Sequence, residues 1–260
     1  MVRLGQPAPT GVYVYCVAPA QPLAGADPPV HVTGIGGQHV RAVQHDGLAA
    51  VVSDAATARY DISRENLLAH ERVVEGVLAR TDVLPMRFGT MAASDEDVRE
   101  ELLIWLRDAL VEQLERVRGC VELGLKALWE RDYLFASIVS QSARIRALRD
   151  EIAAKPQAAT YFDRITLGQL TEAAIRDRSQ REAGALLDAV QTLAREVRVN
   201  DPIGDMMLLN AAFLVARGGK QAFDARVAEL EHAYAGRVTL KYAGPLPPYN
   251  FVDLALHAED

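Results

Sequence analysis

The stretch VELGLKALW, residues 121–129, is the clearest strand signal in the chain. Apolar residues stand at every second position, and Glu122, Gly124 and Lys126 separate the first four of them. Because successive side chains of a β-strand point to opposite faces, this alternation predicts a strand with one buried face. We therefore expect residues 121–129 to begin a sheet that the following residues complete.

The residues after this strand predict two helical regions and three more strands. A long helical region is expected from about residue 132 to residue 197, with a break near Lys155 and Pro156, because proline lacks the amide hydrogen that a helix needs. The apolar run at residues 206–215 is typical of a central strand buried on both faces. The other expected elements are a strand at residues 197–199, a helix after Gly219 with Phe223, Val227 and Leu230 on its inner face, and a strand at residues 238–242. The resulting order β, α, β, β, α, β is that of a ferredoxin-like unit with an enlarged first crossover.

The first half of the chain predicts a smaller α+β unit. Residues 12–17, VYVYCV, are rich in the valine and tyrosine that strands favour. Asp46 and Gly47 separate two short apolar runs, and this pair indicates a β-hairpin because both residues tolerate a positive φ. The other expected elements are a helix that begins at Ser63 and carries His70 on its apolar stripe, and an extended segment at residues 83–89.

A second helix of this half begins at a capping signal. Ser94 and Asp97 have the spacing of an acidic capping box. The apolar residues that then recur at helical spacing are Val98, Leu102, Trp105, Leu106, Ala109 and Leu110. We expect one continuous helix to about residue 117, with Trp105 on its apolar stripe.

These elements predict an α+β protein of two domains. We expect residues 1–118 to form an N-terminal domain of one sheet and helices. Residues 119–260 are expected to form the ferredoxin-like C-terminal domain, with a long helical crossover and a proline-rich tail. A length of 260 residues suits two domains of ordinary size.

Composition disfavours several classes of function. The formal net charge of -7 argues against nucleic-acid binding, which depends on basic patches. Cys16 and Cys120 lie in apolar runs without metal-ligand spacing, so we expect two buried free thiols. The longest apolar run, residues 206–216, is too short to span a membrane, and the N-terminus lacks the features of a signal peptide. We therefore expect a cytoplasmic protein without membrane contact.

The sequence offers no recognisable catalytic site. It lacks a nucleophile elbow, a zinc-binding His-Glu-x-x-His motif and a phosphate-binding loop, so we expect no enzyme activity, cofactor, metal or small-molecule substrate. His70 is expected to be packed or at an interface, because a general base needs a partner. Arg87 stands between Met86 and Phe88 in an extended segment. It either faces solvent or forms an ion pair, or it anchors a carboxylate of a partner or of the other domain.

The C-terminal segment GPLPPYNF, residues 244–251, combines prolines with two aromatic residues. Proline-rich chain is extended and loses little entropy on docking. Tyr249 and Phe251 therefore either fold back onto the protein or meet a partner. Our candidate interaction or domain-junction residues are Arg87, Phe88, Tyr249 and Phe251.

Four segments together resemble the gas vesicle protein F/L family. They are VYVYCV at residues 12–17, VLPMRFGT at residues 83–90, VELGLKALW at residues 121–129 and YAGPLPPYNFV at residues 242–252. They follow the order of the family and span nearly the whole chain. Leu246 is a departure, because many members have tryptophan there.

The resemblance implies a two-domain α+β protein with ferredoxin-like elements that serves gas vesicle assembly. It also implies contacts with the small hydrophobic shell protein of gas vesicles and with other accessory proteins, at the gas vesicle or in the cytoplasm. Two alternatives stay open. One is a minor structural component retained in the gas vesicle shell, and the other is a ferredoxin-like small-molecule-binding protein or enzyme.

Overall fold

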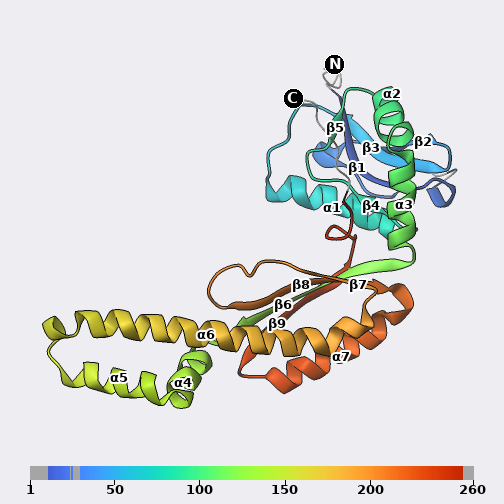
Figure 1. Ribbon diagram of the computed structural model, residues 1–260. Helices are drawn as coiled ribbons and strands as arrows, with labels where there is room; N and C mark the ends of the chain where they lie inside the picture. The colour runs from blue at the N-terminus through green and yellow to red at the C-terminus, as the bar shows by residue number, and fades with distance from the viewer. Residues whose placement is uncertain (1–10, 24, 26–29, 254–260) are drawn as a thin grey trace. The chain divides into compact units, whose positions relative to one another are not determined.

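The computed structural model describes residues 11–23, 25 and 30–253, and it confirms the α+β class (Figure 1). Among the described residues, one compact unit holds residues 11–122 and 245–253, and the other holds Leu123–Gly244. The first division lies a few residues after the expected one. The tail differs from expectation, because we assigned it to the C-terminal domain and it packs with the first unit. The physical reason is that the large apolar ring of Phe251 is favourably buried, and it is buried in the first unit.

The first unit contains an antiparallel sheet built around a buried strand. Its strands are β2 (Val40–His45), β3 (Leu48–Ala55), β1 (Gly11–Pro19) and β4 (Leu84–Pro85), in that order, and β5 (Met91–Ala92) also pairs with β1. The predicted strand and hairpin are confirmed. Asp46 and Gly47 have φ angles of 42° and 82°, which the turn between β2 and β3 requires.

Helix α1 (Arg64–Leu78) begins where the sequence predicts. The Ser63 side chain accepts a hydrogen bond from the amide of Asn66, which satisfies one of the free donors at the start of the helix. Its buried residues are His70, Val73, Val74, Val77 and Leu78, and the helix packs against β1. The expected position of His70 on the apolar stripe is therefore confirmed.

The prediction of one continuous helix over residues 98–117 is wrong. Helix α2 (Asp95–Asp97), capped by Ser94 as expected, continues into a π-helical segment (Val98–Ile104), and α3 (Arg107–Val117) follows after a break. The amide of Trp105 donates to the carbonyl of Glu100, five residues earlier, at 3.0 Å. A π turn holds more residues than an α turn, so it rotates Trp105 off the apolar stripe. The Trp105 side chain is 73% exposed.

The second unit contains a four-stranded sheet covered by helices. Its elements are β6 (Cys120–Trp129), α4 (Arg131–Gln141), α5 (Ala143–Ala154), α6 (Tyr161–Val190), β7 (Glu196–Val199), β8 (Met207–Ala216), α7 (Lys220–Tyr234) and β9 (Val238–Leu246). The strand order is β7-β8-β6-β9, so β8 is central as expected. The predicted helix break at Lys155 and Pro156 is present, and a second one lies at Ser142.

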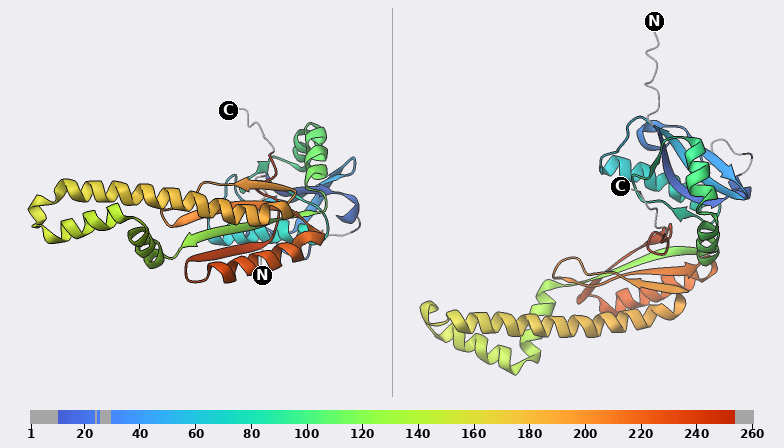
Figure 2. Two further views of the ribbon diagram at one scale, coloured as in Figure 1. Left: turned by 60° about the horizontal axis from the view of Figure 1, so that its bottom comes forward. Right: turned by 45° about the horizontal axis from the view of Figure 1, so that its top comes forward.

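Helices α6 and α7 lie against one face of this sheet (Figures 1 and 2). Phe223 of α7 packs on Phe213 of β8, with ring centroids 5.1 Å apart. Helices α4 and α5 pack against α6 (Figure 2). The second core therefore lies between the sheet and these two helices, while α4 and α5 extend the helical layer.

Two further expectations concern the cysteines and membrane helices. Cys16 and Cys120 are both buried thiols, and they form no disulfide with each other, as predicted. Within the described ranges, no helix has the length and apolar character needed to cross a bilayer.

Candidate functional site

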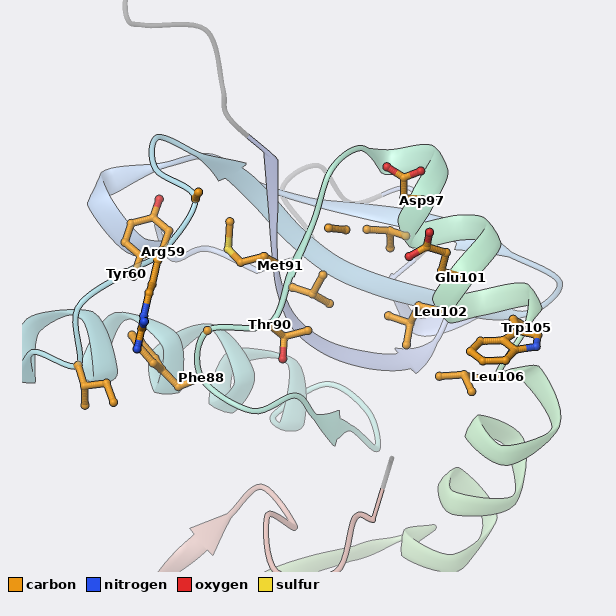
Figure 3. Close-up of a pocket in the computed structure, with 16 residues that line it drawn as sticks. Arg59, Tyr60, Phe88, Thr90, Met91, Asp97, Glu101, Leu102, Trp105 and Leu106 are labelled. Carbon is orange, nitrogen blue, oxygen red and sulfur yellow. The ribbon is translucent and has the colours of Figure 1, made fainter. Parts of the chain in front are cut away.

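The first unit carries an open groove of about 1080 Å³ (Figure 3). Its floor includes the buried residues Val14 and Leu102. Figure 3 shows Arg59, Tyr60 and Phe88 on one side and Trp105 of the helical segment on the other, with Met91 between them. The large apolar side chains at its rim stay in contact with solvent, above all Trp105 and Ile62. The groove is therefore an exposed hydrophobic surface with walls.

The charges around the groove are unequally distributed. Asp97 and Glu101 lie on the helical side, and Arg59 lies on the opposite side (Figure 3). Ser94 holds Asp97 through a hydrogen bond of 2.7 Å from its hydroxyl to the carboxylate. Glu101 forms no ion pair within the part of the chain that the structure describes. The helical edge thus favours a ligand whose apolar face is flanked by basic groups.

The helical wall is tied to the sheet by Arg41 of β2. The Arg41 guanidinium donates two hydrogen bonds to the carboxylate of Asp95, at 2.7 and 3.1 Å, and forms an ion pair of 2.8 Å with Asp54 of β3. A bidentate pair of this kind fixes orientation as well as distance. The capping residue Ser94 stands beside Asp95, so the first turn of the wall is fixed before any ligand binds.

An aromatic cluster lies directly behind the groove. The Tyr13 hydroxyl accepts a hydrogen bond from the amide of Gly89 at 2.9 Å, and a second hydrogen bond of 3.0 Å joins it to Nδ1 of His70. The ring centroid of Phe88 lies 6.1 Å from that of Tyr13 and 5.9 Å from that of His70. Phe88 therefore belongs both to the groove wall and to the packed interior.

His70 is a packed residue in this cluster. Burial lowers its pKa to about 4, and the nearby backbone of Met86 opposes this shift, although the buried Nε2 atom of His70 has no hydrogen-bond partner among the described residues. The imidazole is consequently neutral near pH 7, which suits its packing among aromatic rings. Arg87 does not join it, because the Arg87 side chain is exposed.

Arg87 is accordingly expected to contribute little to folding. It forms no ion pair with any other described residue, so Arg87→Ala should change the free energy of unfolding by less than about 0.5 kcal/mol. Urea unfolding measures this change. Arg41→Ala, which removes the Asp95 pair, is the matched control and should lose about 1 kcal/mol or more. A loss at Arg87 as large as that at Arg41 would show that Arg87 holds a structural contact.

The C-terminal tail folds back onto the first unit. Phe251 is completely buried, at 0% exposure, whereas Tyr249 is partly exposed. The buried Glu122 carboxylate accepts hydrogen bonds from the backbone amide of Asn250 at 2.8 Å and from its side-chain amide at 2.6 Å. Burial raises the pKa of Glu122, and these two hydrogen bonds oppose the rise. The aromatic residues of the tail were expected either to fold back onto the protein or to contact a partner. Phe251 folds back onto the protein.

Tyr249 is much more exposed than Phe251, at 39%. Desolvation raises the pKa of its hydroxyl, and the nearby carboxylates of Glu71 and Glu75 add to the rise. Its exposed edge leaves part of the ring accessible. The structure thus separates the four candidates into a wall residue, Phe88, an exposed cation, Arg87, and two tail residues.

Sequence reasoning missed the exposed rim of the groove. Trp105 was assigned to an apolar stripe, and Ile62 and Met91 carried no signal beyond their hydrophobicity. A π turn has no recognisable pattern in a single sequence, so only the fold could reveal this rim. Across the described residues, no group of three or more His, Cys, Asp or Glu side chains could hold a metal ion.

The sequence matches known proteins over nearly its whole length. The model of the family described as gas vesicle synthesis protein GvpL/GvpF matches residues 11–253. Gas vesicle protein F of Microcystis aeruginosa is 28% identical over 246 residues, which cover 94% of this chain and 98% of that protein. Gas vesicle protein F of a Streptomyces species is 33% identical, over 86% of this chain and 93% of that protein.

Two crystal structures of gas vesicle protein GvpF share the fold. The structure from an Anabaena species superposes with a TM-score of 0.82 at 27% identity, covering 95% of this chain and 99% of that one. The structure from Microcystis aeruginosa gives a TM-score of 0.78 at 27% identity, covering 94% and 100% of the two chains. The likeness therefore extends over both compact units.

Proposed function

The chain belongs to the GvpL/GvpF family of gas vesicle synthesis proteins, and from this premise we propose that it is a non-catalytic accessory protein of gas vesicle assembly. In this proposal it binds the small hydrophobic shell protein and other accessory proteins, at the gas vesicle and in the cytoplasm around it. The observation that carries the proposal is the open groove of the first unit, whose rim exposes Trp105 and Ile62. Contiguous exposed apolar surface of this kind marks interaction sites.

The groove suits an apolar segment of the shell protein. Trp105 provides a large aromatic anchor, the residue type that most often dominates binding energy at interfaces. Phe88 lines the opposite wall and is backed by Tyr13 and His70, so little side-chain entropy is lost when a partner packs on it. In this proposal Arg87, which is exposed and follows Met86 directly before Phe88 in the chain, pairs with a carboxylate of the partner. Tyr249 and Phe251 support the unit that presents the groove.

Co-purification of the tagged chain with the shell subunit tests this function. We expect enrichment of the shell subunit over an unrelated acidic control protein. Trp105→Ala should lower the recovered shell subunit about tenfold or more, because loss of a central aromatic anchor costs on the order of 2 kcal/mol. Phe162→Ala is the matched control, since Phe162 is an exposed aromatic residue of the second unit outside the groove.

Two results would count against the proposal. Recovery no greater than with the acidic control would exclude binding of the shell subunit. Equal recovery of the shell subunit by Trp105→Ala and Phe162→Ala would show that the shell subunit binds the chain at a site other than the groove.

We also propose that the second unit is a ferredoxin-like domain with an enlarged first crossover. Its elements follow the order β6, α4 to α6, β7, β8, α7, β9, and its sheet has the order β7-β8-β6-β9. Both orders support the split βαβ arrangement, in which two βαβ halves interleave in one sheet. Helices α4 and α5 and the first part of α6 are then the enlargement.

A further inference from the structure

The second unit has a groove of its own, of about 770 Å³. It lies along α6 and is completed by α4, by Asp205 and Met206, and by Met207 at the start of β8. The α6 residues that line it run from Arg164 to Ser179, a distance of about 22 Å at the rise of an α-helix. The groove is therefore elongated, which suits a helical segment of a partner better than a compact small molecule.

Three arginines line this second groove, and two of them form no ion pair among the described residues. Arg176 pairs with Glu172 at 2.9 Å. Arg131 and Arg164 form no ion pair with any described residue, and Asp205 is the one remaining acidic residue of the lining. The lining thus has three arginines against two carboxylates, a surplus of one positive charge in a protein whose formal net charge is -7.

A buried arginine of α6, next to the groove lining in sequence, adds a further positive charge to this region. Arg178 is 7% exposed and precedes Ser179 of the groove lining. Its guanidinium lies 5.3 Å from the ring centroid of Trp129 and 5.4 Å from that of Tyr133, and it donates hydrogen bonds to the hydroxyls of Ser137 and Tyr133. No carboxylate within the described ranges neutralises it. This region of the second unit therefore attracts negative charge.

The floor of the second groove is apolar and adaptable. Phe135 is partly exposed there, and Leu167 and Ile175 of α6 continue the surface. Met206 and Met207 complete it. Methionine side chains are unbranched and flexible, and they are common on surfaces that accept helices of varied sequence.

We propose that this second groove binds an acidic amphipathic helix of a partner protein. The apolar face of that helix packs on Phe135, Leu167 and Met206, and its carboxylates pair with Arg131 and Arg164. The groove of the first unit has an acidic edge instead, so one ligand does not suit both sites. The chain consequently joins two different proteins, one on each unit. This inference does not depend on binding of the shell protein and goes beyond it.

Fluorescence anisotropy with the full-length chain tests this inference. The probe is a labelled synthetic helix of about 18 residues, five helical turns, with leucine on one face and glutamate beside it. Its twin has lysine in place of every glutamate. We expect saturable binding of the acidic peptide, at least about tenfold weaker binding of the basic twin, and weakening of the acidic complex as salt is added.

Variants locate the binding on the protein. Arg131→Glu together with Arg164→Glu should weaken the acidic peptide about tenfold or more. Arg144→Glu together with Arg181→Glu is the matched control, because these exposed arginines lie on α5 and α6 outside the lining. The control pair should bind nearly as the unaltered protein does. Trp105→Ala should also leave the acidic peptide bound, which separates this site from the groove of the first unit.

Several outcomes would overturn the inference. Equal binding of the acidic and basic peptides would contradict it. An equal loss of affinity for the acidic peptide in the groove double variant and in the control double variant would contradict it as well. Self-association that depends on concentration in sedimentation, and that disappears with Arg131→Glu and Arg164→Glu, would assign the groove to a second copy of the chain instead.

Discussion

Phe251→Ala is expected to destabilise the first unit by about 3 to 5 kcal/mol, the usual cost of removing a fully buried phenylalanine. Phe251 is 0% exposed, although it lies close to the end of the described chain. Its ring is the hydrophobic anchor of the tail, and the neighbouring Asn250 satisfies the buried Glu122 carboxylate through two hydrogen bonds. Loss of the ring should therefore release Asn250 as well, and the Glu122 carboxylate would lose both donors.

The measurement must report on the first unit by itself. Urea unfolding of the whole chain mixes two compact units, so hydrogen exchange of the β1 amides should accompany it. Phe162→Ala is the matched control, because the Phe162 side chain is 78% exposed and its loss should change stability by less than about 0.5 kcal/mol. A loss below about 1 kcal/mol for Phe251→Ala would mean that the tail does not close the first unit.

The second large effect is a loss of folding stability at low pH, which we attribute to the lowered pKa of His70. Its pKa is lowered to about 4 in the folded protein, against an ordinary value of 6.5. Below pH 6.5 His70 is therefore protonated in the unfolded chain, whereas in the folded protein it stays neutral until the pH falls to about 4. The contribution of neutral His70 to the free energy of unfolding is fully present above pH 6.5. It is lost as the pH falls toward 4, by about 3 kcal/mol in total.

His70→Gln isolates this contribution from other titrating groups. Glutamine offers both a donor and an acceptor to the Tyr13 hydroxyl but does not titrate, so the stability of the unaltered protein relative to this variant should fall by about 3 kcal/mol between pH 7 and pH 4. His232→Gln, at an exposed position on α7, is the matched control for replacing a histidine by glutamine outside the buried cluster. A relative stability independent of pH would show that His70 is not buried in its neutral form.

Glu122 acts in the opposite direction. Because burial raises its pKa, the folded protein takes up a proton there before the unfolded chain does, and the effect of Glu122 is to increase stability as the pH falls through the raised pKa. The comparison with His70→Gln removes this effect, since Glu122 is present in both proteins.

The sequence by itself determined most of the elements and their order. The alternation in residues 121–129 predicted β6, Asp46 and Gly47 predicted the hairpin, and Ser63 and Ser94 predicted two helix starts. These features depend on neighbours a few residues away, so a single sequence contains what is needed to see them. The four quoted segments also resembled the gas vesicle protein F/L family, which the comparisons then showed.

Only the tertiary structure decided which residues became surface and which became core. Glu122 was expected on the polar face of its strand, yet Asn250, far along the chain, covers it. Trp105 was expected on an apolar stripe, yet the π turn exposes it. The tail belongs to the first unit although it follows the second in sequence. Both grooves likewise combine residues that are distant along the chain. The physical reason is that burial and pairing depend on non-local packing, which the periodicity of a segment does not contain.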